Sequence, residues 1–332
     1  MILLNKEKLI TNTVYFLLFF GFLAYQIIQI YLKGVDHIPS SIYLDTLKGL
    51  KDITVTTEPI YFIITNVLIF FGVPLVAILP IISQIIFGLL LYSFLIAAEP
   101  LSHEKKRIIL LLTAFSFITI ANSEAIIRQG IGMVFFTAFL FSERKTKWLH
   151  LILAILAHNV FAVVGIFYIL LSEVLKGKIN FKFLTSSFLL VFISLFIQKI
   201  LNWLGHLTNR TGYLDYSTNS PFIDFNYNFL AALLFCGLIA GFNYLSQKNP
   251  EIKLISWKVL VLNFSVIVMQ FAFAGFPFLD RLIYIPLIYL SFVICMFPLR
   301  PKFITYVGYA LWILVNVIYM TSKTSQACEP YC

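Results

Sequence analysis

The chain has 332 residues, of which 60% are hydrophobic and only 12% are charged, and its formal net charge is +9. About a quarter of the residues of a soluble globular domain are charged, so this composition excludes an ordinary soluble protein. The positive charge does not indicate nucleic-acid binding, because most Lys and Arg residues lie in short connections between apolar runs and no nucleic-acid-binding motif occurs. We attribute the charge to membrane topology.

Apolar runs follow one another along the whole chain. The longest reach or exceed the roughly 20 residues that a helix needs to cross a hydrocarbon core of about 30 Å. The alternation of apolar and polar residues that is typical of a membrane β-barrel strand is missing. We therefore expect an all-α, polytopic transmembrane helical bundle with about 10–11 hydrophobic segments, in one membrane domain over 1–332. The segments are 13–32, 59–72, 74–98, 107–121, 126–141, 148–171, 181–201, 225–246, 257–275, 279–297 and 303–320.

Lys6 and Lys8 precede the first apolar run, and no small-x-small cleavage site follows it. This favours an uncleaved signal anchor with its N-terminus in the cytoplasm, followed by a first outer loop over residues 33–58. The next run, 59–72, would extend only about 20 Å as a helix. That length is less than the hydrocarbon core, so whether this run crosses the membrane stays open.

The run 148–171 has basic residues on both sides and His158-Asn159 at its centre. We expect a pair of half-length, re-entrant-like helices that meet at His158, and the alternative is one span with His158 at mid-depth. Elsewhere, basic connections such as Lys105 to Arg107 alternate with connections of balanced charge, such as the second outer loop at 202–224. The positive-inside rule assigns the basic connections to the cytoplasm and the others to the outer side.

Arg128 is the clearest candidate for a functional residue, because an ionisable group among apolar helices is costly at membrane depth. Its guanidinium could bind a phosphate or carboxylate through two parallel hydrogen bonds. The simpler interpretation is an interfacial Arg that pairs with Glu124, four residues earlier, along a helix face. Gln129 comes next, and Gly130 and Gly132 would permit another helix to approach closely.

Other polar residues each allow a structural and a functional interpretation. His158 is either a hydrogen-bonded structural group or a general base. Glu58 either caps the helix that follows it or acts as a second base. Arg210, with Tyr213 nearby, and Arg281 either belong to ordinary outer connections or bind a phosphorylated sugar.

No metal-ligand cluster, phosphate-binding loop or dinucleotide fingerprint occurs in the sequence. We therefore expect neither a metal nor an organic cofactor. Cys236 and Cys295 lie inside apolar runs, and we interpret them as packing residues.

Several short motifs occur in an order that resembles one known family. They are Glu58-Pro59-Ile60-Tyr61-Phe62, Ile127-Arg128-Gln129-Gly130-Ile131, a basic turn from Ser142 to Lys147, Ala157-His158-Asn159, Arg210 with Tyr213, and the helix-starting Arg281. In this order they resemble the EpsG family of Wzy-like polymerases, which make bacterial exopolysaccharide, capsule and O-antigen. The resemblance covers most of the chain, although Asn159-Val160 stands where the family commonly has Pro-Ser.

The resemblance implies a polysaccharide polymerase, which is a membrane glycosyltransferase with a GT-C-like fold. It would lie in the bacterial inner (cytoplasmic) membrane with its active site facing the periplasm or exterior. Donor and acceptor would be oligosaccharide repeat units linked to undecaprenyl pyrophosphate, and a chain-length regulator and a flippase are further candidate partners. His158 or Glu58 would accept the proton of the attacking hydroxyl. The substrate-binding residues would be Arg128, Arg210, Arg281, Tyr213 and Gln129.

Two other functions compete with this one. A transporter, such as a flippase of the lipid-linked oligosaccharide, would also need basic groups in a membrane cavity, but it predicts inverted internal repeats, and none is visible in the sequence. A membrane O-acyltransferase acting on surface polysaccharide would use a His as its base and take its acyl donor from the cytoplasmic side. A cytoplasmic position of His158 would favour that enzyme.

Overall fold

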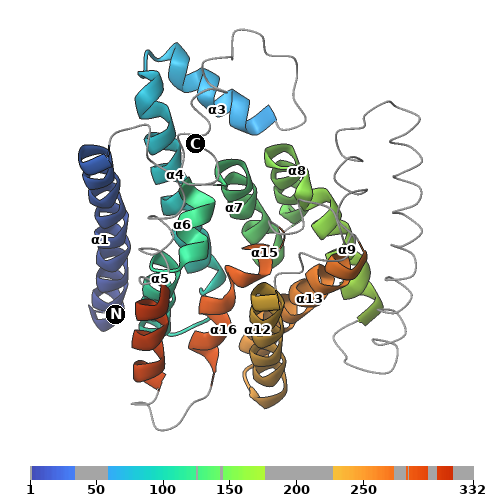
Figure 1. The fold of residues 1–332 in the computed structure, drawn as a ribbon. Coiled ribbons are helices and arrows are strands. Elements are labelled where there is room, and N and C mark those ends of the chain that lie inside the picture. Colours follow the sequence, from blue (N-terminus) through green and yellow to red (C-terminus); the bar gives the residue numbers. More distant parts are fainter. Residues whose placement is uncertain are drawn as a thin grey trace, which may run out of the picture. The chain divides into compact units, whose positions relative to one another are not determined.

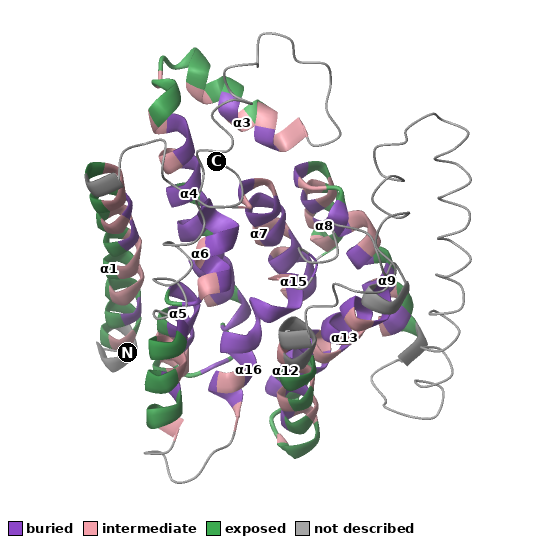
Figure 2. Cartoon of the chain, viewed as in Figure 1, coloured by how far each residue is buried: buried purple, intermediate pink, exposed green. Residues whose placement is uncertain are grey.

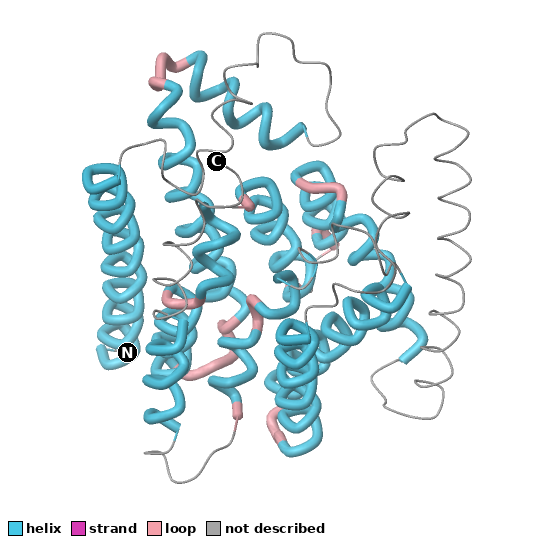
Figure 3. The backbone as a smooth tube through the Cα atoms, viewed as in Figure 1, coloured by secondary structure: helices cyan, strands magenta, loops and turns pink. Residues whose placement is uncertain are grey.

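The computed structural model describes residues 2–33, 59–124, 126–142, 145–175, 227–272, 282, 284–297 and 305–316. The chain divides into two compact units, of which the first comprises Met1–Phe161 with Pro298–Cys332 and the second Ala162–Phe297. Throughout the described ranges the regular structure is helical (Figure 3). The predicted outer loops at 33–58 and 202–224 lie almost wholly outside these ranges.

Within the described residues, the first unit contains seven labelled helices and one further helix (Figure 1). They are α1 (Ile2–Lys33), α3 (Pro59–Phe70), α4 (Leu75–Ala97), α5 (His103–Ala114), α6 (Phe117–Glu124), α7 (Ile127–Phe141), α8 (Lys147–Ala157) and the helix at 305–316. The second unit contains most of α9 (Val160–Leu175), together with α12 (Tyr227–Ser246), α13 (Pro250–Ala272), α15 (Tyr284–Leu287) and α16 (Leu290–Met296).

Three of the described helices are long and apolar enough to cross a membrane, namely Lys6–Tyr31 in α1, Leu75–Ala97 in α4 and Pro250–Met269 in α13. The α5–α6 pair becomes a fourth candidate if its two helices, which bend by 59° at a short break, form one span. The predicted all-α membrane bundle is thereby confirmed. The break itself differs from the single apolar segment that we predicted at 107–121.

Polar and apolar side chains are distributed as a lipid environment demands. On α4, Ile85, Leu89 and Ile96 are exposed along one face, while Ser83 and Gln84 are buried (Figure 2). Lipid-exposed apolar side chains cost nothing, whereas polar groups must find partners inside the bundle. This distribution is the one expected for helices surrounded by lipid.

Helix α1 is held against α4 by stacked rings and two side-chain hydrogen bonds. The rings of Phe22 and Phe87 stack with their centroids 4.0 Å apart. The Tyr15 hydroxyl donates to the Gly88 carbonyl at 3.2 Å, and Gln84 Nε2 donates to the Phe19 carbonyl at 2.8 Å. Such bonds satisfy polar groups at a depth where water is scarce.

The connection from α3 to α4 ends one helix and starts the next within a few residues. Gly72 has a φ of +74°, its N–H donates to Ile69 O at 2.9 Å, and the Val73 N–H donates to Leu68 O at 3.1 Å. These are the two bonds of a Schellman motif, which needs a left-handed residue and therefore favours glycine. Pro74 then precedes α4, as the Gly-Pro punctuation of the sequence indicates.

In the second unit, α12 supports the broken α15–α16 segment. Asn243 Nδ2 donates to the Val293 carbonyl at 2.8 Å, and Gln247 Nε2 donates to the Met296 carbonyl at 3.0 Å. Both carbonyls lie in the last turn of α16, where no further helical N–H is available. Cys236 and Cys295 are buried thiols that do not form a disulfide, so their predicted position in the packed interior is confirmed.

Candidate functional site

Three of the predicted site residues are described, namely Arg128, Gln129 and His158, and all belong to the first unit. The others, Glu58, Arg210, Tyr213 and Arg281, lie outside the described residues, so their assignments stay predictions.

Arg128 and Gln129 are the second and third residues of α7. The Arg128 side chain is partly buried and the Gln129 side chain is fully buried. Unpaired N–H groups and the helix dipole make the first turn of a helix favourable for an anion. The local backbone therefore strengthens the positive charge that Arg128 brings to this point.

A helix boundary separates Glu124 from Arg128, so the single helix face that we proposed for this pair does not exist. α6 ends at Glu124 and α7 begins at Ile127. Between them, the Ile126 N–H donates to Ala121 O at 2.8 Å, a five-residue step that is wider than an α-helical turn. The two side chains therefore come from different helices.

Two glycines permit the close packing of α7, as the sequence analysis predicted. A Cβ atom on Gly130 would lie 2.0 Å from the Asn122 carbonyl oxygen in α6. A Cβ atom on Gly132 would lie 2.2 Å from Cε2 of the Phe161 ring. The backbones of α6 and α7 are thus in contact, and this contact fixes the position at which α7 presents Arg128.

His158 lies at a helix break. Its backbone is extended, with φ −157° and ψ 119°, between the end of α8 and the start of α9. Its N–H donates to Ala154 O at 2.9 Å, and its carbonyl accepts from the Phe161 N–H at 3.1 Å. The predicted break at His158 is confirmed, whereas the entry and exit of the two helices on one side of the membrane stays a prediction.

The structure brings Arg128 and His158 to the same end of a helical hairpin. α7 and α8 are joined by a short connection and pack side by side, so they run antiparallel. Arg128 lies about 20 Å along α7 from the connection, and His158 lies about 16 Å along α8 from it. Their levels therefore differ by only about one helical turn.

An aromatic ring links the two regions. The Phe161 ring occupies the space beside Gly132, one turn after Arg128 in α7. The same ring lies edge-on to the His158 ring, with centroids 6.5 Å apart. Arg128 and His158 thus belong to one neighbourhood at this end of the hairpin, and α3 also packs on α8.

Glu124 is a candidate functional residue that the sequence did not reveal, because its spacing suggested only a partner for Arg128. Its side chain is only 7% exposed, and it is the only charged residue in the buried class among the described residues. It ends α6, where the helix dipole disfavours a carboxylate, and it lies near enough to Tyr25 to interact with it electrostatically. A carboxylate buried at this place needs a cation, hydrogen-bond donors or a proton.

The interior around α6 contains further polar groups. Ser83 Oγ, Thr119 Oγ1 and Asn122 Oδ1 are buried, and none has a hydrogen-bond partner within the described structure. Buried polar oxygens of this kind usually bind ordered water or a polar ligand group. Among all residues that the structure describes, no group of three His, Cys, Asp or Glu side chains could hold a metal ion.

Comparison of the chain with protein-family models, with curated proteins and with solved structures finds no match. The resemblance to the EpsG family therefore rests on the motifs and on their order along the chain.

Proposed function

We propose that this protein is a membrane glycosyltransferase that polymerises oligosaccharide repeat units carried on undecaprenyl pyrophosphate. The observation that carries the proposal is the placement of Arg128 and His158 at one end of the α7–α8 hairpin. Arg128 is in the first turn of a helix, and His158 lies in an extended helix break. An anion-binding group and a titratable base are thus available within one neighbourhood of a lipid-embedded bundle.

The reaction needs both kinds of group. A sugar hydroxyl of the acceptor attacks the anomeric carbon of the donor, and the bond from that carbon to the pyrophosphate oxygen breaks. Negative charge develops on the departing lipid pyrophosphate, and a guanidinium at a helix N-terminus stabilises it through two hydrogen bonds. The proton of the attacking hydroxyl passes to a base, and His158 is the described candidate.

Residues outside the described ranges complete the proposed site. Arg210 and Arg281 would add positive charge around the pyrophosphate, Tyr213 would pack on a sugar ring, and Glu58 is the alternative base. These assignments rest on the order of the family-like motifs. Glu58 immediately precedes α3, which packs on α8, and this supports a place for Glu58 near the same site.

A flippase of the lipid-linked oligosaccharide is the second candidate, and two features favour it. The α5–α6 pair is bent by 59° at its break, and several polar groups are buried beside it. Discontinuous helices around a polar interior are typical of transporters. The same arrangement serves an enzyme that must receive a polar substrate at membrane depth, so the two functions need an experiment to separate them.

The decisive experiment uses the purified full-length protein in liposomes that contain a fluorescent lipid-linked repeat unit. A polymerase produces a ladder of longer products, together with one free undecaprenyl pyrophosphate for each linkage formed. A flippase leaves the repeat unit unchanged but exposes inner-leaflet label to a reducing quencher added outside. Exposure of the label without any ladder would reject the polymerase and support the transporter.

A further inference from the structure

A helix late in the chain contacts both helices of the bent α5–α6 pair. In this helix, at 305–316, the Tyr306 hydroxyl donates to Glu104 Oε1 in the first turn of α5. About 15 Å further along, Asn316 Oδ1 accepts a hydrogen bond of 3.0 Å from the N–H of Phe117, the first residue of α6. The 305–316 helix, red in Figure 1, therefore runs beside α5 in the same direction and reaches across the 59° bend.

The 305–316 helix turns one face toward the protein. Tyr309 and Asn316 are buried and lie seven residues apart, on the same side of the helix, whereas Leu311 and Val315 on the opposite side are exposed. The Asn316 side chain is fixed within its own helix, because Nδ2 donates to the Trp312 carbonyl at 2.9 Å. Its oxygen is thus held in place to accept from the first N–H of α6.

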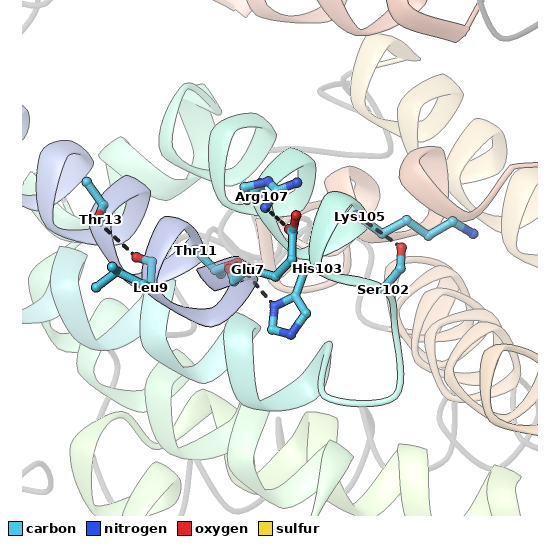
Figure 4. Close-up of polar contacts among 8 residues, drawn as sticks. All are labelled: Glu7, Leu9, Thr11, Thr13, Ser102, His103, Lys105 and Arg107. Carbon is cyan, nitrogen blue, oxygen red and sulfur yellow. Dashed lines mark hydrogen bonds and ion pairs between the residues drawn. The ribbon is translucent and has the colours of Figure 1, made fainter. Parts of the chain in front are cut away.

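The first helix of the bent pair, α5, is fixed by α1. Arg107 Nη1 of α5 donates to Glu7 Oε2 of α1 at 2.5 Å, and Thr11 Oγ1 lies 3.3 Å from His103 Nδ1 (Figure 4). Leu110, further along α5, belongs to a buried apolar cluster to which α1 also contributes. These contacts set the direction of α5, so the direction of α6 depends on what holds the break.

The second helix of the pair, α6, connects Asn316 to the start of α7. It has only 8 residues, which is a length of about 12 Å. Asn316 contacts its first residue, and near its other end the Asn122 carbonyl oxygen lies 2.0 Å from the place that a Cβ on Gly130 would take. A change in the direction of α6 would therefore move the first turn of α7, which carries Arg128.

We propose that Asn316 is a positioning residue for Arg128. It caps the N-terminus of α6 from a distant helix, a role that a residue next to the helix start usually has, and so fixes the direction of α6 and the place of Arg128. A guanidinium that binds a departing pyrophosphate through two parallel hydrogen bonds needs this accuracy, since a displacement of about 1 Å can cost about a hundredfold in rate. The effect on turnover rests on the proposed function, whereas the effect on α6 does not.

The first test measures polymerisation by the full-length protein in liposomes that contain the lipid-linked repeat unit. Asn316→Leu removes the accepting oxygen and should lower kcat by about tenfold to a hundredfold with a smaller change in KM, because Arg128 acts on charge that develops in the transition state. Asn316→Asp keeps an accepting oxygen and should retain most of the activity. Val315→Ala, an exposed neighbour in the same turn, should leave kcat unchanged. Normal kcat in Asn316→Leu, or equal losses in the Leu and Asp variants, would overturn the proposal.

The second test does not depend on activity. Hydrogen exchange of the same variants, measured by mass spectrometry, should show amides of α6 exchanging about fivefold faster in Asn316→Leu than in the wild type, with α1 and α4 unchanged. Equally faster exchange in α1, α4 and α6 would show general destabilisation and overturn the proposal, as would unchanged exchange in α6. A wild-type protein that makes no ladder would reject the polymerase, and the exchange result would still decide whether Asn316 positions α6.

Discussion

Arg128 illustrates how a backbone position changes what a side chain can do. An Arg in the first turn of α7 adds its charge to that of the helix N-terminus, and its planar guanidinium offers two parallel donors that an ammonium lacks. If it binds a departing pyrophosphate, Arg128→Ala and Arg128→Lys should both lower polymerisation about a hundredfold to a thousandfold. Polymer length on a gel, read beside an immunoblot of the membrane fraction, measures this effect.

Arg107 provides the control for that substitution. It pairs with Glu7 at the contact between α1 and α5 and takes no part in the proposed chemistry, so Arg107→Lys should leave polymer length unchanged. Full-length polymer from Arg128→Lys, at normal protein level, would contradict a bidentate pyrophosphate contact and favour a purely interfacial Arg.

Burial of Glu124 shows the limit of sequence reasoning at the level of single residues. The sequence presents this carboxylate as one member of a possible ion pair, since Arg128 follows four residues later. Its actual burial depends on the break between α6 and α7 and on the backbone contact at Gly130. Neither is encoded by spacing, because both arise from how separate helices pack.

The backbone contact between α6 and α7 gives a clear prediction about the free energy of unfolding. Gly130→Ala places a Cβ atom against the backbone carbonyl of Asn122, which cannot move without shifting α6. We expect a loss of about 2–3 kcal/mol in the free energy of unfolding, together with a lower thermal midpoint in detergent.

Gly21→Ala is the matched control, because Gly21 lies in α1 with nothing within 4 Å of an added Cβ. There the substitution should be neutral or raise the stability by up to about 1 kcal/mol, since alanine favours the helix. Equal stability of Gly130→Ala and Gly21→Ala would mean that α6 and α7 are not in backbone contact.

In the second unit, the amide of Asn243 can be tested in the same way. Asn243→Leu removes the donor to the Val293 carbonyl, a buried group in the last turn of α16. Leaving that carbonyl unpaired should cost about 1–3 kcal/mol, seen as a lower thermal midpoint. Leu238→Ala, on the exposed face of α12, should change the midpoint little, and a larger effect there than at Asn243 would contradict the assignment.

Some of the helix ends and breaks can be predicted from the sequence, and others cannot. The turn at Gly72–Pro74 and the break at His158 follow from local chemistry, and both are predicted. The break between α5 and α6 has neither Gly nor Pro nearby. The N–H of Phe117, the first residue of α6, donates to Asn316 Oδ1 at 3.0 Å. A partner that lies 199 residues away leaves no local signal, which is why this break is absent from the predicted segments.

At the scale of the whole molecule, one ion pair bears on the topology of the N-terminal region. The contact between Glu7 and Arg107 joins the start of α1 to the start of α5, so both must lie on one side of the membrane. α1 and α4 are each long enough to cross once, and two crossings return the chain to its starting side. A further crossing by the 12-residue α3 would separate Glu7 from Arg107.

The last prediction follows from this parity and from the distribution of Lys and Arg. If α3 adds no crossing, as the parity argument predicts, cysteines introduced at Thr56 and Val73 should both react with an impermeant external reagent. Cysteines at Ser102, Ser142 and Lys178 should be shielded until the membrane is permeabilised, and one at Thr218 should react. Labelling at Thr56 but not at Val73 would show that α3 crosses, and labelling at Ser142 with none at Thr218 would invert the orientation.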